Sequence, residues 1–269
     1  DRIVQAGRIV YRQPLQANQQ VTPVLSRVSV GCRGEPTMPG LLLGDEFPNF
    51  EADTTIGRIK IHDFLGSSWG ILFSHPKDFT PVCTTELACA ARISDEFKKR
   101  GVKMIALSID SVEDHRHWSK DVMAFNSETE SPLPFPIIAD DKRELSVQLG
   151  MLDPDERDKD GMPLTARCVR ILSSVLSCPV FVIGPDKKLK LSILYPATTG
   201  RNFDELLRVI DSLQLTAQKK VATPVNWKPN DKVMVIPSLS EAEATALFPN
   251  GVTTKEVPSG KKYLRYTQL

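Results

Sequence analysis

Residues 69–109, WGILFSHPKDFTPVCTTELACAARISDEFKKRGVKMIALSI, contain two apolar runs separated by a polar loop and a helical pattern. The run Trp69–Ser74 is short and apolar, which is typical of a buried strand. Thr80–Arg100 places apolar residues along one side, which predicts a helix. Val102–Ile109 predicts the next strand. This strand, helix, strand order favours an α/β architecture.

The rest of the chain continues the alternation. Ser111 is predicted to cap a helix that ends near Phe125, and Asn202 to cap one that ends near Leu215. Further strands are predicted at Phe135–Ala139 and, as a hairpin around a Gly-Pro-Asp-Lys turn, at Val180–Gly184 and Leu189–Leu194. Together these elements predict an α/β sandwich with a mixed sheet.

The length of 269 residues fits one or two domains. A proline-rich break at residues 223–231 favours a main domain over 38–220 and a small C-terminal module over 221–269. In that module we expect a strand at Val233–Ile236, a capped helix from Ser240 to Phe248, and a hairpin arm at Ser259–Tyr266.

Composition excludes several protein classes. Lys and Arg number 34 and Asp and Glu 33, so the net charge of +1 gives no case for nucleic-acid binding. No apolar run approaches the ~20 residues of a membrane-spanning helix. The five cysteines are irregularly spaced, which argues against a disulfide scaffold and a zinc site, so we expect no bound metal and a reducing compartment. They are Cys32, Cys83, Cys89, Cys168 and Cys178.

The N-terminal stretch, residues 1–37, contains five arginines, no lysine, and only Asp1 and Glu35 as acids. This composition is similar to that of a mitochondrial transit peptide. It lacks an apolar face of helical period, however, so the favoured interpretation is an extension ahead of a start at Met38, disordered or artefactual.

Cys83 stands at a predicted helix start. Thr80 is a good N-cap residue and Pro81 suits the first helical position, which places Cys83 at the third. Backbone N–H groups in the first turn have no acceptor within the helix, and the positive end of the helix dipole lies there. Such settings lower a thiol pKa from ~8.5 towards ~3.5–7.5. The residues therefore predict a nucleophilic thiolate, with an inert buried cysteine as the alternative.

The segment Pro76-x-x-x-Thr80-x-x-Cys83 resembles the active-site signature of the peroxiredoxin family, and the chain from Met38 on is similar to its one-cysteine class. The resemblance implies a thioredoxin-like fold whose C-terminal extension helps to build a homodimer. It also implies that Cys83 is the peroxidatic cysteine, that Thr80 and Arg167 activate it, and that His75 and Pro76 border the pocket.

The same resemblance implies substrates and a reductant. Thr223–Trp227 lacks the resolving cysteine of two-cysteine relatives, so an external thiol would be needed. The family implies glutathione as co-substrate, delivered by a pi-class glutathione S-transferase, with no bound cofactor. Hydrogen peroxide, organic hydroperoxides and phospholipid hydroperoxides are the implied substrates, and the cytoplasm, with the lysosome as a second site, is the implied location.

A second motif, Gly66-Ser-Ser-Trp-Gly70, fits G-x-S-x-G around Ser68. A strand follows the serine instead of a helix, so the residues alone favour a plain turn. The family resemblance implies a calcium-independent phospholipase A2 site acting at phospholipid surfaces, with Ser68 as nucleophile, His62 as base and Asp186 as orienting acid. Ser67 replaces an acid of the family, which puts an associated acyltransferase activity in doubt.

Residues 168–179 do not fit the family pattern. Either Cys168–Leu172 replaces the strand that follows Arg167, or the insert bulges out after Arg167. If the insert inactivates the site, the alternative function is a non-catalytic chaperone or scaffold dimer. A resolving role for Cys168 or Cys178 is a further hypothesis.

Four other residues carry predictions. We expect His115 and His117 to be solvated on an exposed helix. Trp118 and Trp227 are expected to be core or interface residues.

Overall fold

A computed structural model describes residues 41–128, 131–157, 163–165, 178–195 and 199–269. The expected N-terminal extension, residues 1–37, lies outside the described residues. Within the part that is described, no helix is long and apolar enough to cross a membrane.

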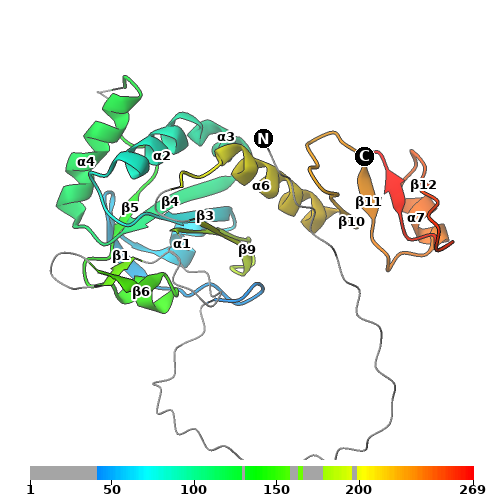
Figure 1. Ribbon diagram of the computed structural model, residues 1–269, viewed down its shortest axis with the longest axis horizontal. Coiled ribbons are helices and arrows are strands. Elements are labelled where there is room, and N and C mark those ends of the chain that lie inside the picture. Colours follow the sequence, from blue (N-terminus) through cyan, green and yellow to red (C-terminus); the bar gives the residue numbers. More distant parts are fainter. Residues whose placement is uncertain (1–40, 129–130, 158–162, 166–177, 196–198) are drawn as a thin grey trace, which may run out of the picture. The chain divides into compact units, whose positions relative to one another are not determined.

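Seven strands form the main sheet: β1 (Glu51–Thr54), β2 (Gly57–Lys60), β3 (Trp69–Ser74), β4 (Val102–Ser108), β5 (Ile137–Ala139), β8 (Cys178–Ile183) and β9 (Leu189–Tyr195). Their order is β2-β1-β5-β4-β3-β8-β9. The three central strands β5, β4 and β3 are parallel, and the outer strands pair antiparallel. The predicted mixed sheet is therefore confirmed (Figure 1).

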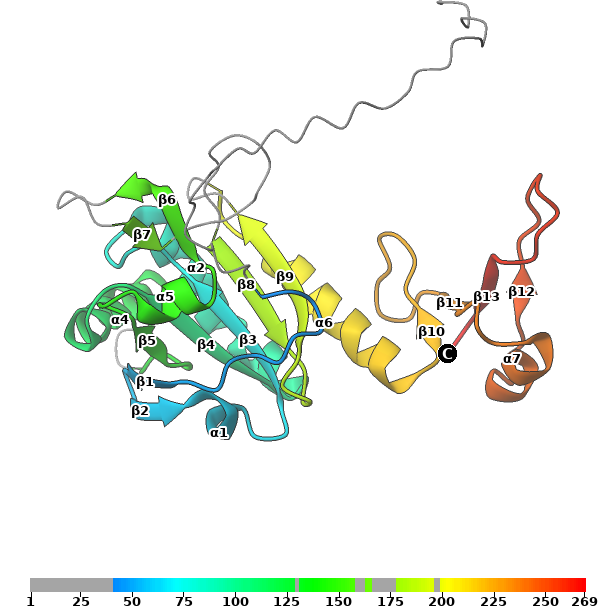
Figure 2. The same ribbon diagram turned by 90° about the horizontal axis from the view of Figure 1, so that it is seen from below.

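Helices cover both faces of this sheet because alternate strand residues point to opposite sides. Ile71 and Phe73 of β3 join one buried cluster, and Leu72 joins the other. The first cluster includes residues of α2 (Pro81–Arg92), α4 (Val112–Phe125) and α6 (Phe203–Gln218). The second includes α1 (Ile61–Leu65) and is flanked by α5 (Glu144–Gln148). Figures 1 and 2 show these two helical layers.

Several element bounds differ from the prediction. The single helix expected over Thr80–Arg100 is two helices, α2 and α3 (Ser94–Lys99), which meet at Ile93. Ile93 has φ −102° and ψ 12°, which ends α2 before α3 begins. The expected cap of α4 is confirmed, because Ser111 and Asp114 form a reciprocal capping box.

The strand beside β3 decides between the two placements of the insert. Val180–Ile183 of β8 pair with Gly70–Phe73, so the residues after the insert keep the position next to β3. The alternative in which Cys168–Leu172 replaces this strand is wrong. Residues 166–177 lie outside the described ones.

The remaining strands form two small sheets. β6 (Leu152–Arg157) pairs with β7 (Pro163–Thr165). At the C-terminus, β10 (Val221–Ala222), β11 (Val233–Val235), β12 (Thr253–Thr254) and β13 (Arg265–Thr267) form a sheet in the order β10-β11-β13-β12, accompanied by α7 (Glu241–Leu247). Trp227 is in the core of this module, as expected.

The hairpin arm expected at Ser259–Tyr266 is only partly correct. Of that stretch, only Arg265 and Tyr266 lie in a strand, β13, and the partners of β13 are β11 and β12. Residues 255–264 connect β12 to β13 without forming a strand.

Candidate active site

Cys83 lies where the sequence predicts it. α2 begins with Pro81, so Cys83 is its third residue, and its side chain is only 2% exposed. Trp118 and Phe73 belong to the same buried cluster. Burial among apolar side chains opposes ionisation of the thiol, whereas the positive end of the helix stabilises the thiolate.

Thr80 occupies the N-cap position in extended conformation, but its hydroxyl does not cap the helix. Oγ1 donates to the carbonyl of Lys77 at 3.0 Å, back along the loop. The carbonyl of Thr80 accepts the Thr84 amide at 3.0 Å and the Thr84 hydroxyl at 2.8 Å. These bonds fix the loop that delivers Pro76 and Phe79 to the start of α2.

Phe79 is the strained point of this loop. It has φ 54°, in the left-handed region that non-glycine residues rarely adopt, and its side chain is 57% exposed. The residues on both sides are held by hydrogen bonds, Asp78 through its side chain and Thr80 through its hydroxyl. Such over-determined strain is common at functional loops.

Asp78 joins two histidines in a fully buried chain. His75 Nε2 lies 2.7 Å from Asp78 Oδ1, and His115 Nδ1 lies 2.6 Å from Asp78 Oδ2. The expectation that His115 is solvated is wrong: it is 0% exposed, because it shares the inner side of α4 with Trp118, three residues on. The exposed position of His117 is confirmed.

The Asp78 carboxylate is anionic despite its burial. Burial acts to raise its pKa, but the hydrogen bonds from His115 and His75 outweigh that effect and lower the pKa to about 2. Ser108 adds a third contact, its Oγ lying 3.3 Å from Oδ1. The loop before α2 is thereby tied to the ends of β3 and β4 and to α4.

A buried ion pair that the sequence analysis missed connects α2 to the start of α6. Arg201 Nη1 lies 2.8 Å from Glu86 Oε2, and the Arg201 amide donates to Glu86 Oε1 at 2.7 Å. Arg201 Nη2 also donates to the carbonyl of Ser74. Only the charge of Glu86 on the inner side of α2, three residues after Cys83, could have signalled this pair.

The expected partner Arg167 lies outside the described residues, as do Cys32 and Cys168, and the side chain of Cys178 is not described. Cys89 is half-buried on α2, where Arg92 Nη2 lies 3.7 Å from its sulfur. The described residues thus bring Cys83, Thr80, His75 and Pro76 together around one loop.

The second motif, around Ser68, lies in a different turn from the loop that leads to Cys83. Ser68 is in the turn between α1 and β3, so a helix precedes the serine and a strand follows it, the reverse of a nucleophile elbow. His62 is on α1, and its Nε2 lies 2.6 Å from the carbonyl oxygen of Phe47. Because a carbonyl only accepts, Nε2 is the donor in this hydrogen bond.

Asp186 is in the turn between β8 and β9, with its carboxylate 2.6 Å from Lys190 Nζ and 3.2 Å from the Lys188 amide. The next residue, Lys187, donates from Nζ to Gly66 O, while its own carbonyl accepts the Phe47 amide. These contacts bring the turns around Ser68 and Asp186 to one edge of the sheet. In the described part, no hydrogen bond joins Ser68, His62 and Asp186 to one another.

Comparisons with known proteins identify both parts of the chain. The AhpC/TSA family matches residues 43–192, and the C-terminal domain of 1-Cys peroxiredoxin matches residues 212–251. Peroxiredoxin-6 of Gallus gallus is 72% identical over 231 residues, covering 86% of this chain and 98% of the relative. Peroxiredoxin-6 of Homo sapiens is 69% identical over 232 residues, covering 86% and 99%.

Similar solved structures come from the same family as these relatives. Peroxiredoxin 6 of Arenicola marina, in a cysteine-to-serine mutant, superposes with a TM-score of 0.78 at 62% identity, covering 85% of this chain and 98% of that one. A yeast mitochondrial 1-Cys peroxiredoxin gives a TM-score of 0.72 at 44% identity, covering 85% and 100%. The fold is thus the thioredoxin-like fold of these proteins, and the chain belongs to the peroxiredoxin family, in the one-cysteine class that includes the peroxiredoxin-6 proteins.

Proposed function

We propose that this peroxiredoxin reduces hydrogen peroxide, organic hydroperoxides and phospholipid hydroperoxides at Cys83, with glutathione as the reductant. The observation that carries the proposal is the burial of Cys83 at the third position of α2, beside a loop fixed by Thr80 and Asp78. The scaffold alternative would require this arrangement to serve no chemistry.

The reaction begins with the Cys83 thiolate. Its sulfur attacks the terminal oxygen of the hydroperoxide, an S–O bond forms, and the O–O bond breaks. Sulfur is oxidised to sulfenic acid, and the peroxide is reduced to an alkoxide that takes a proton to become an alcohol or water. In this proposal Arg167 polarises the peroxide, and Pro76 shields the sulfur from bulk water. The hydroxyl of Thr80, whose proton is donated to Lys77 O, accepts a hydrogen bond from the peroxide.

Glutathione then restores the thiol in two steps. A glutathione thiolate attacks the sulfenic sulfur, an S–S bond forms, and the S–O bond breaks to release hydroxide, which takes a proton from solvent to become water. A second glutathione thiolate then attacks the mixed disulfide and releases oxidised glutathione and the Cys83 thiolate. In the similar yeast mitochondrial 1-Cys peroxiredoxin, the thiol is resolved via glutathione and thioredoxin systems, which supports an external thiol here. A pi-class glutathione S-transferase would be the delivering partner.

Rapid mixing with hydrogen peroxide tests the first step. Tryptophan fluorescence gives the rate, and mass spectrometry locates the added oxygen. We expect fast, stoichiometric oxidation of wild type and of Cys89→Ser, and none at position 83 in Cys83→Ser. Oxidation as slow as that of an ordinary thiol would favour the scaffold alternative, and loss of two hydrogens in place of a gained oxygen would indicate a resolving cysteine.

A second activity, phospholipase A2, is proposed for Ser68, His62 and Asp186. The contacts through Phe47 and Lys187 that gather their turns at one sheet edge favour it. Ser68→Ala should abolish hydrolysis of phosphatidylcholine vesicles and leave peroxide reduction intact, whereas the adjacent exposed Ser67→Ala should change neither. Equal hydrolysis by both variants would refute the assignment.

We also propose a homodimer. Strand β9 ends the main sheet, so one of its edges has no partner strand among the described residues, and Leu194 is 37% exposed there. Such edges favour pairing with another strand. Sedimentation should give a dimer for wild type and a monomer for Leu194→Lys, and an unchanged dimer would place the interface elsewhere.

A further inference from the structure

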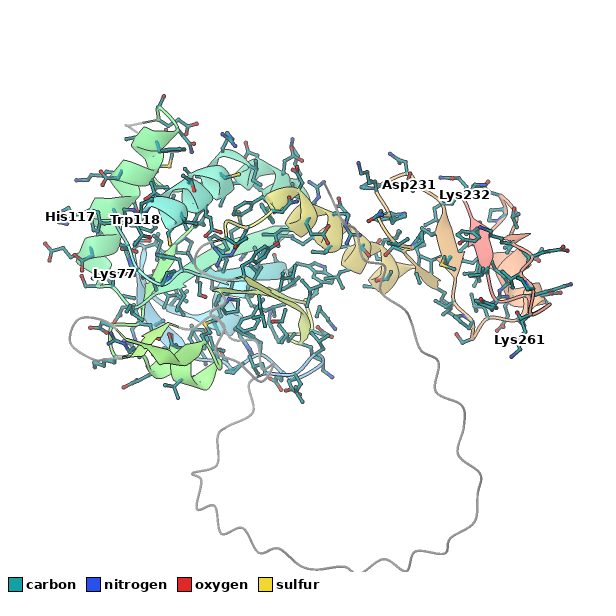
Figure 3. All side chains as sticks on the ribbon, in the orientation of Figure 1. Lys77, His117, Trp118, Asp231, Lys232 and Lys261 are labelled. Carbon is teal, nitrogen blue, oxygen red and sulfur yellow. The ribbon has the colours of Figure 1, made fainter. Side chains whose placement is uncertain are left out.

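A fully buried chain of side chains lies behind the loop that leads to Cys83. It runs from His115 on α4 through Asp78 to His75 at the end of β3, and all three are at most 1% exposed. Figure 3 shows the contrast on α4, where His117 points outward and Trp118 points towards α2. Nothing in the peroxide chemistry above uses His115 or Asp78.

The contacts of His115 fix both of its ring protons. Nε2 lies 3.1 Å from the carbonyl oxygen of Ile138, which can only accept, so Nε2 carries a proton. Nδ1 lies 2.6 Å from the anionic carboxylate of Asp78, so it donates as well. A ring that donates from both nitrogens is an imidazolium, and it neutralises the buried carboxylate.

The contacts of His75 fix its tautomer. Nε2 lies 2.7 Å from the same carboxylate and therefore donates. Nδ1 is buried and has no hydrogen-bond partner among the described residues. Nδ1 lacks a partner in either form, but a proton on it would make His75 a second buried cation beside the single Asp78 carboxylate, so Nδ1 holds a lone pair.

Other ionisable groups do not change this assignment. Asp110 follows β4 and lies beside Asp78. Its Oδ2 already accepts hydrogen bonds from the amide of Asp78 at 2.8 Å and from Ser108 Oγ at 2.9 Å. Asp140, after β5, accepts from Ser146 and Leu145. On the remaining side, the ring of His75 packs on Trp118 with centroids 4.9 Å apart.

We propose that His115 and Asp78 are positioning residues that lock His75 as a neutral ring, with its proton on Nε2 and a lone pair on Nδ1. A fixed, buried hydrogen-bond acceptor is thereby held at the start of the loop that leads to Cys83, where it would serve the reduction of peroxide at that residue. The proposed use of this acceptor rests on the peroxidase function, but the lock itself does not.

Nuclear magnetic resonance of the full, reduced chain tests the lock directly. The protein has four histidines, so long-range ¹H–¹⁵N spectra of ¹⁵N-histidine-labelled protein resolve each ring, with His62→Gln and His117→Gln as assignment variants. Between about pH 6 and about pH 8, we expect both nitrogens of His115 to be protonated, and His75 to show a protonated Nε2 and a bare Nδ1. A bare nitrogen on His115, or a protonated Nδ1 on His75, would overturn the proposal, whether or not the protein reduces peroxide.

Variants connect the lock to reactivity. His115→Gln removes the cation, so Asp78 should draw a second proton onto His75. The rate of Cys83 oxidation should fall about tenfold to a hundredfold, and its pH profile should gain a histidine-like ionisation. The matched control His117→Gln, two residues away on the exposed side of α4, should leave rate and profile unchanged.

Replacement of Asp78 distinguishes an effect on the tautomer of His75 from an effect on the packing around it. In Asp78→Asn, the amide can donate to the Nδ1 of a neutral His115 and accept from Nε2 of His75, which preserves the tautomer. This variant should oxidise within about threefold of wild type, a difference below 1 kcal/mol, while Asp78→Ala should be at least tenfold slower. Equal loss in both folded variants, or an unshifted pH profile in His115→Gln, would refute the lock.

Discussion

The buried pair of Arg201 and Glu86 gives the sharpest stability prediction. Replacing Glu86 with Gln keeps the size of the side chain and an oxygen for the Arg201 amide, but it removes the carboxylate charge. The guanidinium, whose side chain is 0% exposed, then has only neutral acceptors within the described part of the chain, Ser74 O among them. Its Nε already has no partner among the described residues.

The expected loss of unfolding free energy follows from the absence of a charged partner for Arg201 in this variant. Removing one partner of a buried ion pair costs about 3–5 kcal/mol, because the remaining charge stays desolvated. With an m-value of about 3 kcal/mol/M in urea, the unfolding midpoint should fall by about 1–1.7 M. Replacing both partners, as in Glu86→Leu with Arg201→Met, should cost less than either single change, because no charge is then left buried.

Urea unfolding followed by tryptophan fluorescence and by circular dichroism measures these midpoints, and agreement of the two probes checks for a single transition. The matched control is the exposed pair Arg58 and Glu51, whose atoms are 3.2 Å apart and whose side chains are 61% and 57% exposed. Glu51→Gln should not shift the midpoint measurably, because solvent screens such pairs.

One result would refute the reasoning. If Glu86→Gln shifted the midpoint no more than Glu51→Gln, then water or another group would already solvate Arg201, and the pair would not be a buried one. A double variant as unstable as the sum of the single changes would show that the two side chains do not interact.

Three further predictions concern other parts of the main domain. The lowered pKa of Asp78 contributes about 2 kcal/mol of stability, present above its unfolded pKa of ~3.9 and lost as pH falls through about 2, so the urea midpoint of wild type should drop more steeply below pH ~4 than that of Asp78→Asn. Gly70→Ala should destabilise by about 1–3 kcal/mol in the same assay, because a Cβ would lie 2.3 Å from Cδ2 of the fully buried Leu65. Ser111→Ala breaks the capping box of α4 and should lower the free energy of unfolding by about 1 kcal/mol, and an unchanged value would show that the cap does not support the helix.

Most of the fold could be predicted from local sequence patterns. The apolar run of β3, the Ser111 cap of α4 and the Thr80-Pro81 start of α2 each depend on neighbours within a few residues, and each is confirmed. The position of Cys83 followed from them. The break at Ile93 could not be predicted, because the apolar pattern continues through it to Phe97.

The site was less predictable because its contacts join distant residues. Glu86 and Arg201 are far apart in the chain, and no periodicity links them. His115 was misjudged from its polar neighbours, although it is three residues before Trp118 and seven before Val122, a spacing that marks the buried side of α4. The role proposed for Asp78 depends on this placement of His115, which is distant from it in the chain.

The position of β3 also bears on how the chain folds. One of its edges pairs with β4, the next strand along the chain, and the other with the distant β8, as in the pair Phe73 and Val180. The connection from β5 to β8 spans residues 140–177, and the inserted part begins at 168. Residues 168–177 of the insert therefore make up about a quarter of this connection. Lengthening a connection from about 28 to about 38 residues adds only about 0.3 kcal/mol of closure entropy. We therefore expect β3, β4 and β5 to assemble first, and the β8–β9 hairpin to dock at a rate that the insert hardly changes.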